Sequence, residues 1–222
     1  MEISPESLSI ADRYKLLIGG IVPRPIAFVS TVSPEGRFNL APFSFYSGVA
    51  SNPMTVLFCP ANDGQGREKD TLRNCKPVEE GGTGEFVVNA AVERYAPEVA
   101  ACAEALAYGE SEFALCGLTP APAAAVRAPR VKESPLCLEC RTVQVVRTNP
   151  GAPSGGNIVI GRVLHVFVRD DVIDARHRID PSALAAFGRM GGPTYTRTRE
   201  RFDMPMGRGA LDLRGQTPGE RS

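Results

Sequence analysis

The stretch from residue 24 to residue 47, RPIAFVSTVSPEGRFNLAPFSFYS, constrains the fold more than any other part of this chain. Residues 26–33 are rich in β-branched and aromatic side chains, which predicts a strand. Ser33-Pro34-Glu35-Gly36 then places proline and glycine where a type I turn prefers them. A second strand is expected at about 37–43. The core therefore begins with two strands joined by a tight turn.

The second strand and the residues after it carry small or hydroxylated side chains where valine and isoleucine would be usual. They are Asn39, Ala41, Pro42, Ser44 and Ser47, with the aromatic Phe43, Phe45 and Tyr46 among them. A surface this small and polar suits a flat ligand that lies against the backbone. Together with Ser30 and Thr31 on the first strand, these residues form a candidate binding site. The alternative is that serine and threonine only occupy strand ends and turns here.

The rest of the chain is typical of further strands with a few short helices. Strands are expected at 54–59, 85–89, about 136–147 and about 157–169, and residues 14–25 are expected to approach the first strand in an extended form. Helices are expected from Asp70, a plausible N-cap, to Cys75, from Pro97 to about Leu106, at 112–116 and from Pro181. Because strands and helices do not alternate, a mainly β fold with short helices, a closed antiparallel barrel, is favoured over a doubly wound sheet.

Composition excludes several classes of protein. The 222 residues include 25 Lys and Arg and 25 Asp and Glu, so the net charge is zero, which argues against a general nucleic-acid or acidic-membrane surface. No apolar run is long enough to span a bilayer. The first six residues lack the basic and apolar parts of a signal peptide. We therefore expect a soluble, cytoplasmic protein that binds neither nucleic acid nor membrane.

Six cysteines are present, and without an export signal they are expected to be reduced thiols. Cys137 and Cys140 have the spacing of a redox or zinc motif. Their segment has the pattern of a strand, however, so the two side chains should point to opposite faces and serve packing. No second such pair completes a zinc site, and only two histidines occur, so no metal site is expected.

Two cationic positions are candidates for phosphate binding. Lys69, Asp70 and Thr71 follow a glycine-containing loop and open a short helix, where a cation, a hydroxyl and free N–H groups would come together. Arg24 stands between two prolines that stiffen its backbone, and a guanidinium can hold phosphate through two parallel hydrogen bonds. The alternatives are a plain helix start with a solvated lysine and a solvated arginine before a strand.

A glycine-rich segment near residue 190 offers Arg189 and Tyr195, a charge and an aromatic ring, although it can also be an ordinary turn. His165 and His177 are far apart in sequence and give no support for a catalytic site. Neither a Ser–His–Asp arrangement nor a pair of carboxylates can be defended from spacing. No catalytic residue is therefore predicted.

The order of these motifs resembles the flavin reductase-like, FMN-binding split-barrel family over roughly residues 14–206. The resemblance rests on residues 23–27 (PRPIA), Ser30-Thr31, Gly36, residues 39–44 (NLAPFS), Lys69-Asp70-Thr71, residues 85–89 (EFVVN), Ser111-Glu112-Phe113, Leu138-Glu139-Cys140, Ile160-Gly161 and Arg189 to Tyr195. It implies a split β-barrel that forms a homodimer and binds FMN without a covalent bond near the subunit boundary.

The resemblance also implies roles for individual residues. Those that would line the flavin ring and ribityl chain are Ser30, Thr31, Asn39, Ala41, Pro42, Ser44, Phe45 and Ser47. Lys69, Asp70 and Thr71 would hold the phosphate, and Arg24 would help them. Arg189 and Tyr195 would approach the cofactor, either within one subunit or from the other subunit of the dimer. The chain departs from the family pattern at Arg162, where glutamate is common, and in the loop 62–67.

The function implied by the resemblance is that of an FMN-binding oxidoreductase, an NAD(P)H-dependent flavin reductase. NADH or NADPH would be the electron donor, and a flavin, another small molecule, a monooxygenase or a redox protein would accept the electrons. The alternatives are a flavoredoxin-like electron carrier without nicotinamide activity and a non-enzymatic ligand-binding dimer. Residues 1–206 are expected to form the split-barrel domain and residues 207–222 a flexible C-terminal tail.

Overall fold

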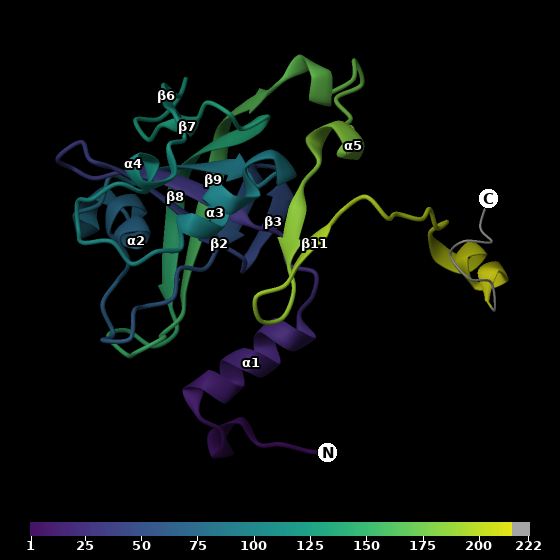
Figure 1. Ribbon diagram of the computed structural model, residues 1–222, viewed down its shortest axis with the longest axis horizontal. Helices are drawn as coiled ribbons and strands as arrows, with labels where there is room; N and C mark the ends of the chain where they lie inside the picture. Colours follow the sequence, from purple (N-terminus) through teal and green to yellow (C-terminus); the bar gives the residue numbers. More distant parts are fainter. Residues whose placement is uncertain (215–222) are drawn as a thin grey trace.

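The computed structural model describes residues 1–214 and is built on a seven-stranded antiparallel sheet with the order β2-β1-β5-β8-β9-β4-β3 (Figure 1). Its strands are β1 (Ala27–Val32), β2 (Phe38–Phe43), β3 (Tyr46–Ser51), β4 (Met54–Phe58), β5 (Glu85–Ala90), β8 (Leu136–Arg147) and β9 (Asn157–Val168). The expected strands are confirmed, and β3 is an additional one. Its small residues Ser47, Gly48 and Ala50, with a bulge after Gly48, gave no strand pattern.

The sheet is rolled into a barrel with an open seam. β2 and β3 are its two edges, yet only Ser44 and Phe45 separate them along the chain. Three Cα–Cα steps reach at most about 11 Å, whereas the edges of a flat sheet of seven strands would lie roughly 29 Å apart. The sheet must therefore curl until its edges meet at one corner. No ladder joins β2 to β3 within residues 1–214, so the barrel is split rather than closed.

The barrel interior is filled by aromatic and branched side chains from six strands. Phe43 and Phe86 flank Phe58, with ring centroids 5.3 and 5.2 Å from it. Gly161 on β9 is needed for this packing, because a Cβ there would lie 2.3 Å from Cζ of Phe86. Helix α2 (Asp70–Cys75) contributes Leu72 to the same cluster. The interior therefore fixes α2 against the barrel.

Short helices and a looped segment, residues 120–134, cover part of the outer surface of the sheet. Helices α3 (Ala96–Ala101) and α4 (Glu112–Cys116) pack with β1 and β2 around Phe28 and Leu40. Helix α3 ends before the expected Leu106 because its apolar stripe ends at Cys102, after which Ala103 is exposed. A small ladder, β6 (Pro120–Ala121) with β7 (Arg130–Val131), belongs to the looped segment.

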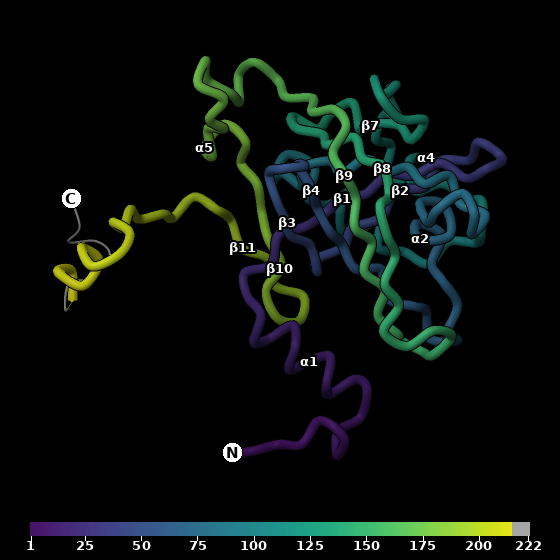
Figure 2. The backbone as a smooth tube through the Cα atoms, turned by 180° about the vertical axis from the view of Figure 1, so that it is seen from behind, coloured from purple at the N-terminus to yellow at the C-terminus, as the bar shows by residue number. Residues whose placement is uncertain are grey.

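The N-terminal segment corrects one expectation. Residues 10–20 form helix α1 (Ile10–Gly20) rather than an extended approach, and Ser9 caps it by accepting a hydrogen bond from the Asp12 N–H over 3.1 Å. Serine three residues before an acid is a helix-start signal that the interpretation of this segment did not use. Figures 1 and 2 show α1 projecting from the barrel beside the hairpin of β10 (Phe187–Arg189) and β11 (Tyr195–Arg197).

The remaining elements are short. Helix α5 (Pro181–Leu184) is capped by Asp180 as predicted. Short 3-10 helices lie at Pro5–Ser7, Val78–Glu80, Glu93–Tyr95, Asp170–Val172 and Gly207–Leu213. The last of these falls in the segment expected to be a tail, and the rest of that tail, 215–222, lies outside the described residues. Across residues 1–214, no helix has the length and apolar character that crossing a membrane requires.

Cys137 and Cys140 pack on opposite faces of the sheet, as predicted from their strand. Cys140 belongs to the barrel interior, and Cys137 packs with Val32, Val87 and Ala128 on the outer face. All six cysteines are free thiols.

Candidate functional site

A cavity of about 440 Å³, which we call the β2 cavity, opens where the free edge of β2 meets the start of α2. Its far wall is the chain segment between α3 and α4. The volume is in the range of small-molecule sites. The lining consists of Asn39, Ala41, Pro42, Phe43, Asp63, residues 67–71, Arg73, residues 102–108 and Glu112. Of the predicted site residues, the cavity brings together Asn39, Ala41, Pro42, Lys69, Asp70 and Thr71.

The edge of β2 gives this cavity an exposed backbone. β2 pairs only with β1, so groups on its other side have no strand partner. The Leu40 N–H is satisfied by Glu112, whose Oε2 accepts it over 2.8 Å. Backbone direction alternates along a strand, so Pro42 also faces outward and offers a carbonyl without an N–H. With the small side chain of Ala41 beside it, this edge can be approached closely by a planar group that donates a hydrogen bond.

Lys69 is the cation of the cavity lining that makes no ion pair within residues 1–214. Arg67 Nε lies 2.8 Å from Asp63 Oδ2, and Arg73 lies 3.6 Å from Asp70 Oδ1. Lys69 is exposed and occupies the N-cap position of α2, where Asp70 was expected. Asp70 is instead the first residue of the helix. The Lys69 ammonium is therefore available to an anionic group in the cavity.

Two carboxyl groups in the cavity have raised pKa values. Burial raises the pKa of Glu112, the nearby charge of Asp70 raises it further, and the N–H of Leu40 opposes both effects. Burial also raises the pKa of Asp70, against the influence of Arg73. Both groups therefore hold a proton more readily than a solvated carboxyl group does.

Buried asparagine side chains hold α2 against the strands next to the cavity. Asn39 Nδ2 donates to Thr71 Oγ1 over 2.9 Å, which leaves the hydroxyl proton of Thr71 to be donated. Asn74 Nδ2 donates to Thr31 Oγ1 over 3.0 Å, behind α2. Thr31 is fully buried and does not line the cavity, so its hydroxyl serves to hold α2 on the barrel.

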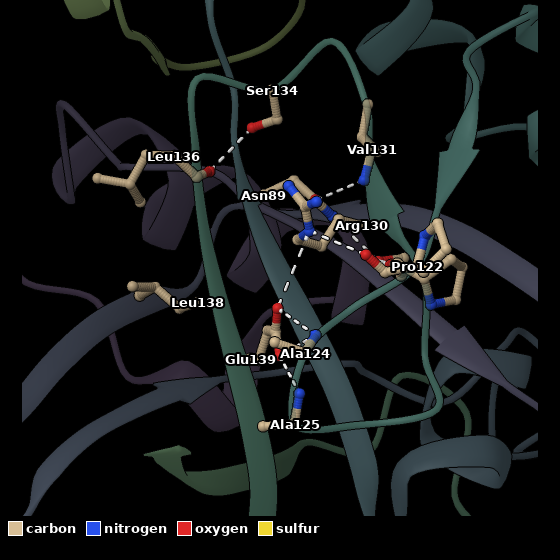
Figure 3. A network of polar contacts seen from close by, with 12 residues as sticks. Asn89, Pro122, Ala124, Ala125, Arg130, Val131, Ser134, Leu136, Leu138 and Glu139 are labelled. Carbon is tan, nitrogen blue, oxygen red and sulfur yellow. Dashed lines mark hydrogen bonds and ion pairs between the residues drawn. The ribbon is translucent and has the colours of Figure 1, made fainter. Parts of the chain in front are cut away.

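Ser30 belongs to a second polar cluster, the inner polar network, formed by Ser30, Asn89, Arg130, Ser134 and Glu139. The Ser30 hydroxyl donates to the carbonyl of Pro129 and accepts from Asn89 Nδ2. Figure 3 shows Glu139 accepting hydrogen bonds from the N–H groups of Ala124 and Ala125, at 2.9 and 2.6 Å. The predicted role of the Ser30 hydroxyl toward a ligand is therefore not supported, because the side chain is buried and fully engaged within the protein.

The Arg24 side chain is buried and links three segments of the chain through hydrogen bonds. Its NH1 donates to the carbonyls of Ile18 and Ile21 over 2.6 and 2.8 Å, and its NH2 donates to Met190 O over 3.0 Å. Its Nε donates to Ser44 Oγ over 3.2 Å. The guanidinium, only 2% exposed, thus joins the end of α1, the β10–β11 hairpin and the β2–β3 connection. Four of its five N–H groups are hydrogen-bonded within the protein and Arg24 does not line the cavity, so its help with phosphate stays a prediction.

The remaining predicted residues lie outside the cavity. Phe45 is in the β2–β3 connection, and its ring centroid lies 5.8 Å from Cζ of Arg24. Ser47 is exposed on β3. Arg189 stacks over the Tyr195 ring at 4.5 Å, within the β10–β11 hairpin. The predicted site residues therefore fall into two sets. One set lines the β2 cavity, and the other lies at the β2–β3 connection and the β10–β11 hairpin.

Sequence reasoning did not single out several residues of the cavity. Glu112 was noted within a motif but given no role, although its burial at 7% exposure signals a function for its carboxyl group. Tyr108, which stacks under Arg73 at 3.7 Å, and Cys102 lie on the far wall. No local pattern pointed to this wall, because it lies far from β2 along the chain and only the fold brings the two together. Within residues 1–214, no group of three His, Cys, Asp or Glu side chains could hold a metal ion.

Comparison with known proteins gives the cavity a context. The profile of the "Flavin reductase like domain" family matches residues 19–189. The chain is similar to the crystal structure of nitrilotriacetate monooxygenase component B from Bacillus cereus, with 34% identity, a TM-score of 0.84 and coverage of 92% of this chain and 98% of that one.

Two further solved structures are similar. One is the 2-nitrobenzoate 2-nitroreductase NbaA of Pseudomonas fluorescens, with 27% identity, a TM-score of 0.80 and coverage of 94% of this chain and 97% of that one. The other is a Shewanella frigidimarina protein with a split barrel domain, at 22% identity, a TM-score of 0.77 and coverage of 93% and 100%, which shows the fold alone. The expected split-barrel class is confirmed.

Proposed function

The chain belongs to the flavin reductase-like family, and from that premise we propose that it is an FMN-binding oxidoreductase that uses NADH or NADPH to reduce a flavin or another small acceptor. The observation that carries this proposal is the β2 cavity, where an unpaired lysine, a hydroxyl proton and an open strand edge face one space. Bound flavin would supply the electron-transfer chemistry, and the protein would supply binding, orientation and electrostatics.

The donor set of the cavity fits FMN. Lys69 and the Thr71 hydroxyl would hold the phosphate, since a dianion needs a cation and hydrogen-bond donors. The Pro42 carbonyl and the small side chain of Ala41 would receive the polar edge of a flat ring. Asp70 and Glu112 lie close to such an anion, and their raised pKa values reduce the repulsion that two ionised carboxylates would cause. Asn39 would act by orienting Thr71.

We propose in addition that the protein is a homodimer. Helix α1 carries Ile10, Tyr14 and Leu17 at helical spacing on one face, Ile21 follows directly after the helix, and each of the four is about half exposed. Further exposed apolar side chains lie on the sheet: Val49, Met54, Val143, Val146, Leu164 and Val166. A second copy would cover these surfaces and bring Phe45, Ser47, Arg189 and Tyr195 to the subunit boundary. Light scattering after size-exclusion chromatography should give twice the chain mass of 23.8 kDa.

The similar proteins favour particular acceptors. Similarity to a monooxygenase component B supports a role in supplying reduced flavin to a monooxygenase. Similarity to a 2-nitroreductase supports a test of nitroaromatic acceptors. We also propose that residues 1–206 act as one split-barrel domain, since the 3-10 helix Gly207–Leu213 lies apart from the barrel in Figures 1 and 2.

Anaerobic titration of the FMN-loaded protein tests the proposal. Addition of NADH or NADPH should bleach the yellow absorbance, and free flavin or a nitroaromatic compound should restore it. Colour retained with both nucleotides, but lost on addition of a reduced redox protein, would replace the reductase role with that of an electron carrier. Protein that takes up no FMN would overturn the assignment of the cofactor.

A further inference from the structure

Two cysteines stand at the two ends of the segment that forms the far wall of the β2 cavity. Cys102 follows the last residue of α3, and Cys116 is the last residue of α4. Both belong to the apolar cluster in which α3 and α4 pack together. The Cys102 sulfur lies 4.0 Å from the carbonyl oxygen of Glu112, one helical turn before Cys116 in α4. The fold therefore brings two free thiols close together, although thirteen residues separate them along the chain.

The segment between the two thiols shapes the cavity. Residues 103–108 all line it, Cys102 lines it as well, and the carbonyl of Glu112 lies 4.0 Å from Cys102 Sγ. Helices α3 and α4 end at residue 101 and begin at residue 112, and after the turn that the N–H groups of residues 102–104 close onto α3, residues 105–109 donate no backbone hydrogen bond of helical spacing. A covalent link between the two ends would close this wall into a ring.

The two thiols differ in exposure, which gives them different roles in oxidation. Cys116 is half-buried and reachable from solvent, whereas Cys102 is 1% exposed. Burial, together with the neighbouring Cys116, raises the pKa of the Cys102 thiol. Burial also raises the pKa of Cys59, Cys75 and Cys137, for none of which another cysteine contributes. Cys75 and Cys140 also share one cluster, the barrel interior, but both are 0% exposed. Cys102 and Cys116 are therefore the clustered pair with one member that an oxidant can reach from solvent.

We propose that Cys102 and Cys116 form a reversible disulfide, with hydrogen peroxide as the oxidant, and that this bond fixes the far wall of the β2 cavity. In the first step Cys116 takes one oxygen from peroxide, its S–H proton leaves with the other oxygen as water, and a sulfenic acid forms. In the second step the Cys102 sulfur attacks the Cys116 sulfur. The S–O bond breaks and hydroxide leaves with the Cys102 proton as water. The two sulfurs lose two electrons in total, and one peroxide becomes two waters.

Mass mapping of the oxidised wild-type protein tests the bond directly. The protein is treated with hydrogen peroxide, blocked with an alkylating agent, digested without reductant and analysed by mass spectrometry. The expected result is one cross-linked species that joins the peptides of Cys102 and Cys116, with the loss of two hydrogens, and that disappears after treatment with dithiothreitol. Oxidation of Cys116 to sulfinic acid while Cys102 stays free, or a link to any other cysteine, would overturn the proposal.

Variants and a second readout separate the bond from general oxidation. Cys116→Ser should give no cross-link, whereas Cys59→Ser, which changes a half-buried cysteine outside the pair, should keep it. Limited proteolysis within residues 103–110 should slow at least tenfold in oxidised wild type and remain unchanged in Cys116→Ser. Equal rates before and after cross-linking would refute the fixing of the wall. None of these measurements needs FMN, so their failure is distinct from failure of the proposed function.

Discussion

The inner polar network and the β2 cavity are built from the same kinds of residue but differ in what their polar groups contact. In the network, Ser30, Asn89 and Glu139 are 0% exposed, and each bonds to backbone groups of the looped segment 120–134. Figure 3 shows these bonds for Asn89 and Glu139. In the cavity, Lys69 has no ion-pair partner within residues 1–214, and Glu112 has a raised pKa. The polar groups of the network are thus bonded within the protein, whereas the cavity keeps an exposed cation without an ion pair among residues 1–214, which an anionic ligand can use.

The largest expected effect is the loss of folding stability when the network loses its buried carboxylate. Glu139→Ala removes the acceptor of two N–H groups and leaves Arg130, whose Nε lies 3.9 Å from Glu139 Oε1, without its partner. Breaking such a buried contact should lower the free energy of unfolding by about 3–5 kcal/mol. Urea unfolding followed by circular dichroism measures it.

Glu85→Ala is the matched control for this prediction. Glu85 also accepts an N–H of the looped segment, that of Arg127 over 2.9 Å, but its cationic partner is 62% exposed. The loss should be about 1 kcal/mol or less. A similar loss for both variants would mean that burial does not distinguish the network from surface pairs.

The next largest effect concerns ligand binding at the cavity. Lys69→Met removes this cation and should weaken the binding of FMN by about 1.5–3 kcal/mol, the usual range for a hydrogen bond to a charged group. The Kd for FMN should then rise roughly ten- to a hundredfold. Riboflavin, which lacks the phosphate, should bind nearly as it does to wild type. Fluorescence titration with both flavins gives the two affinities.

Lys132→Met serves as the control, because Lys132 is exposed and does not line the cavity. It should leave the affinity for both flavins unchanged. Equal weakening of FMN and riboflavin by Lys69→Met would place Lys69 away from the phosphate.

The barrel interior holds the network and the cavity in place, and a substitution there should cause a smaller loss of folding stability. Gly161→Ala places a methyl group against the Phe86 ring, and overpacking of this kind costs about 1–3 kcal/mol. Gly48→Ala on β3, where a Cβ would meet no atom within 4 Å, should be nearly neutral. Thermal unfolding compares the two, and equal stability would show that Phe86 can move aside freely.

The smallest effect is a dependence on pH at Glu112. Its pKa is higher in the folded than in the unfolded protein, so the folded state binds more protons between the two values. The free energy of unfolding therefore falls as pH rises through that window, which begins near the ordinary glutamate value of about 4.3. Glu112→Gln does not titrate, so its stability relative to wild type should rise with pH across this window. A constant difference in urea unfolding would contradict the raised pKa.

The fold followed from the sequence wherever the residue pattern was local. Runs rich in β-branched and aromatic residues predicted β1, β4, β5, β8 and β9, and Asp180-Pro181 predicted α5. Helix α1 was missed because neither the helical spacing of Ile10, Tyr14 and Leu17 nor its capping pair was used. β3 was missed because small residues carry no strand signal.

The candidate site followed only in part. Lys69, Thr71 and Pro42 were recognised because they lie on short contiguous motifs. Ser30 and Thr31 have the same chemistry, but strand pairing on both sides and the overlying segments bury them, which no spacing reveals. The far wall comes from distant sequence and became visible only in the folded chain.

Hydrogen–deuterium exchange with and without saturating FMN tests the central claim most directly. We predict slower exchange for backbone N–H groups of residues 67–71 and 103–108, which line the β2 cavity, and no change for residues 124–131 beside the inner polar network. Protection confined to residues 124–131 or to β3, with none at the cavity, would contradict it.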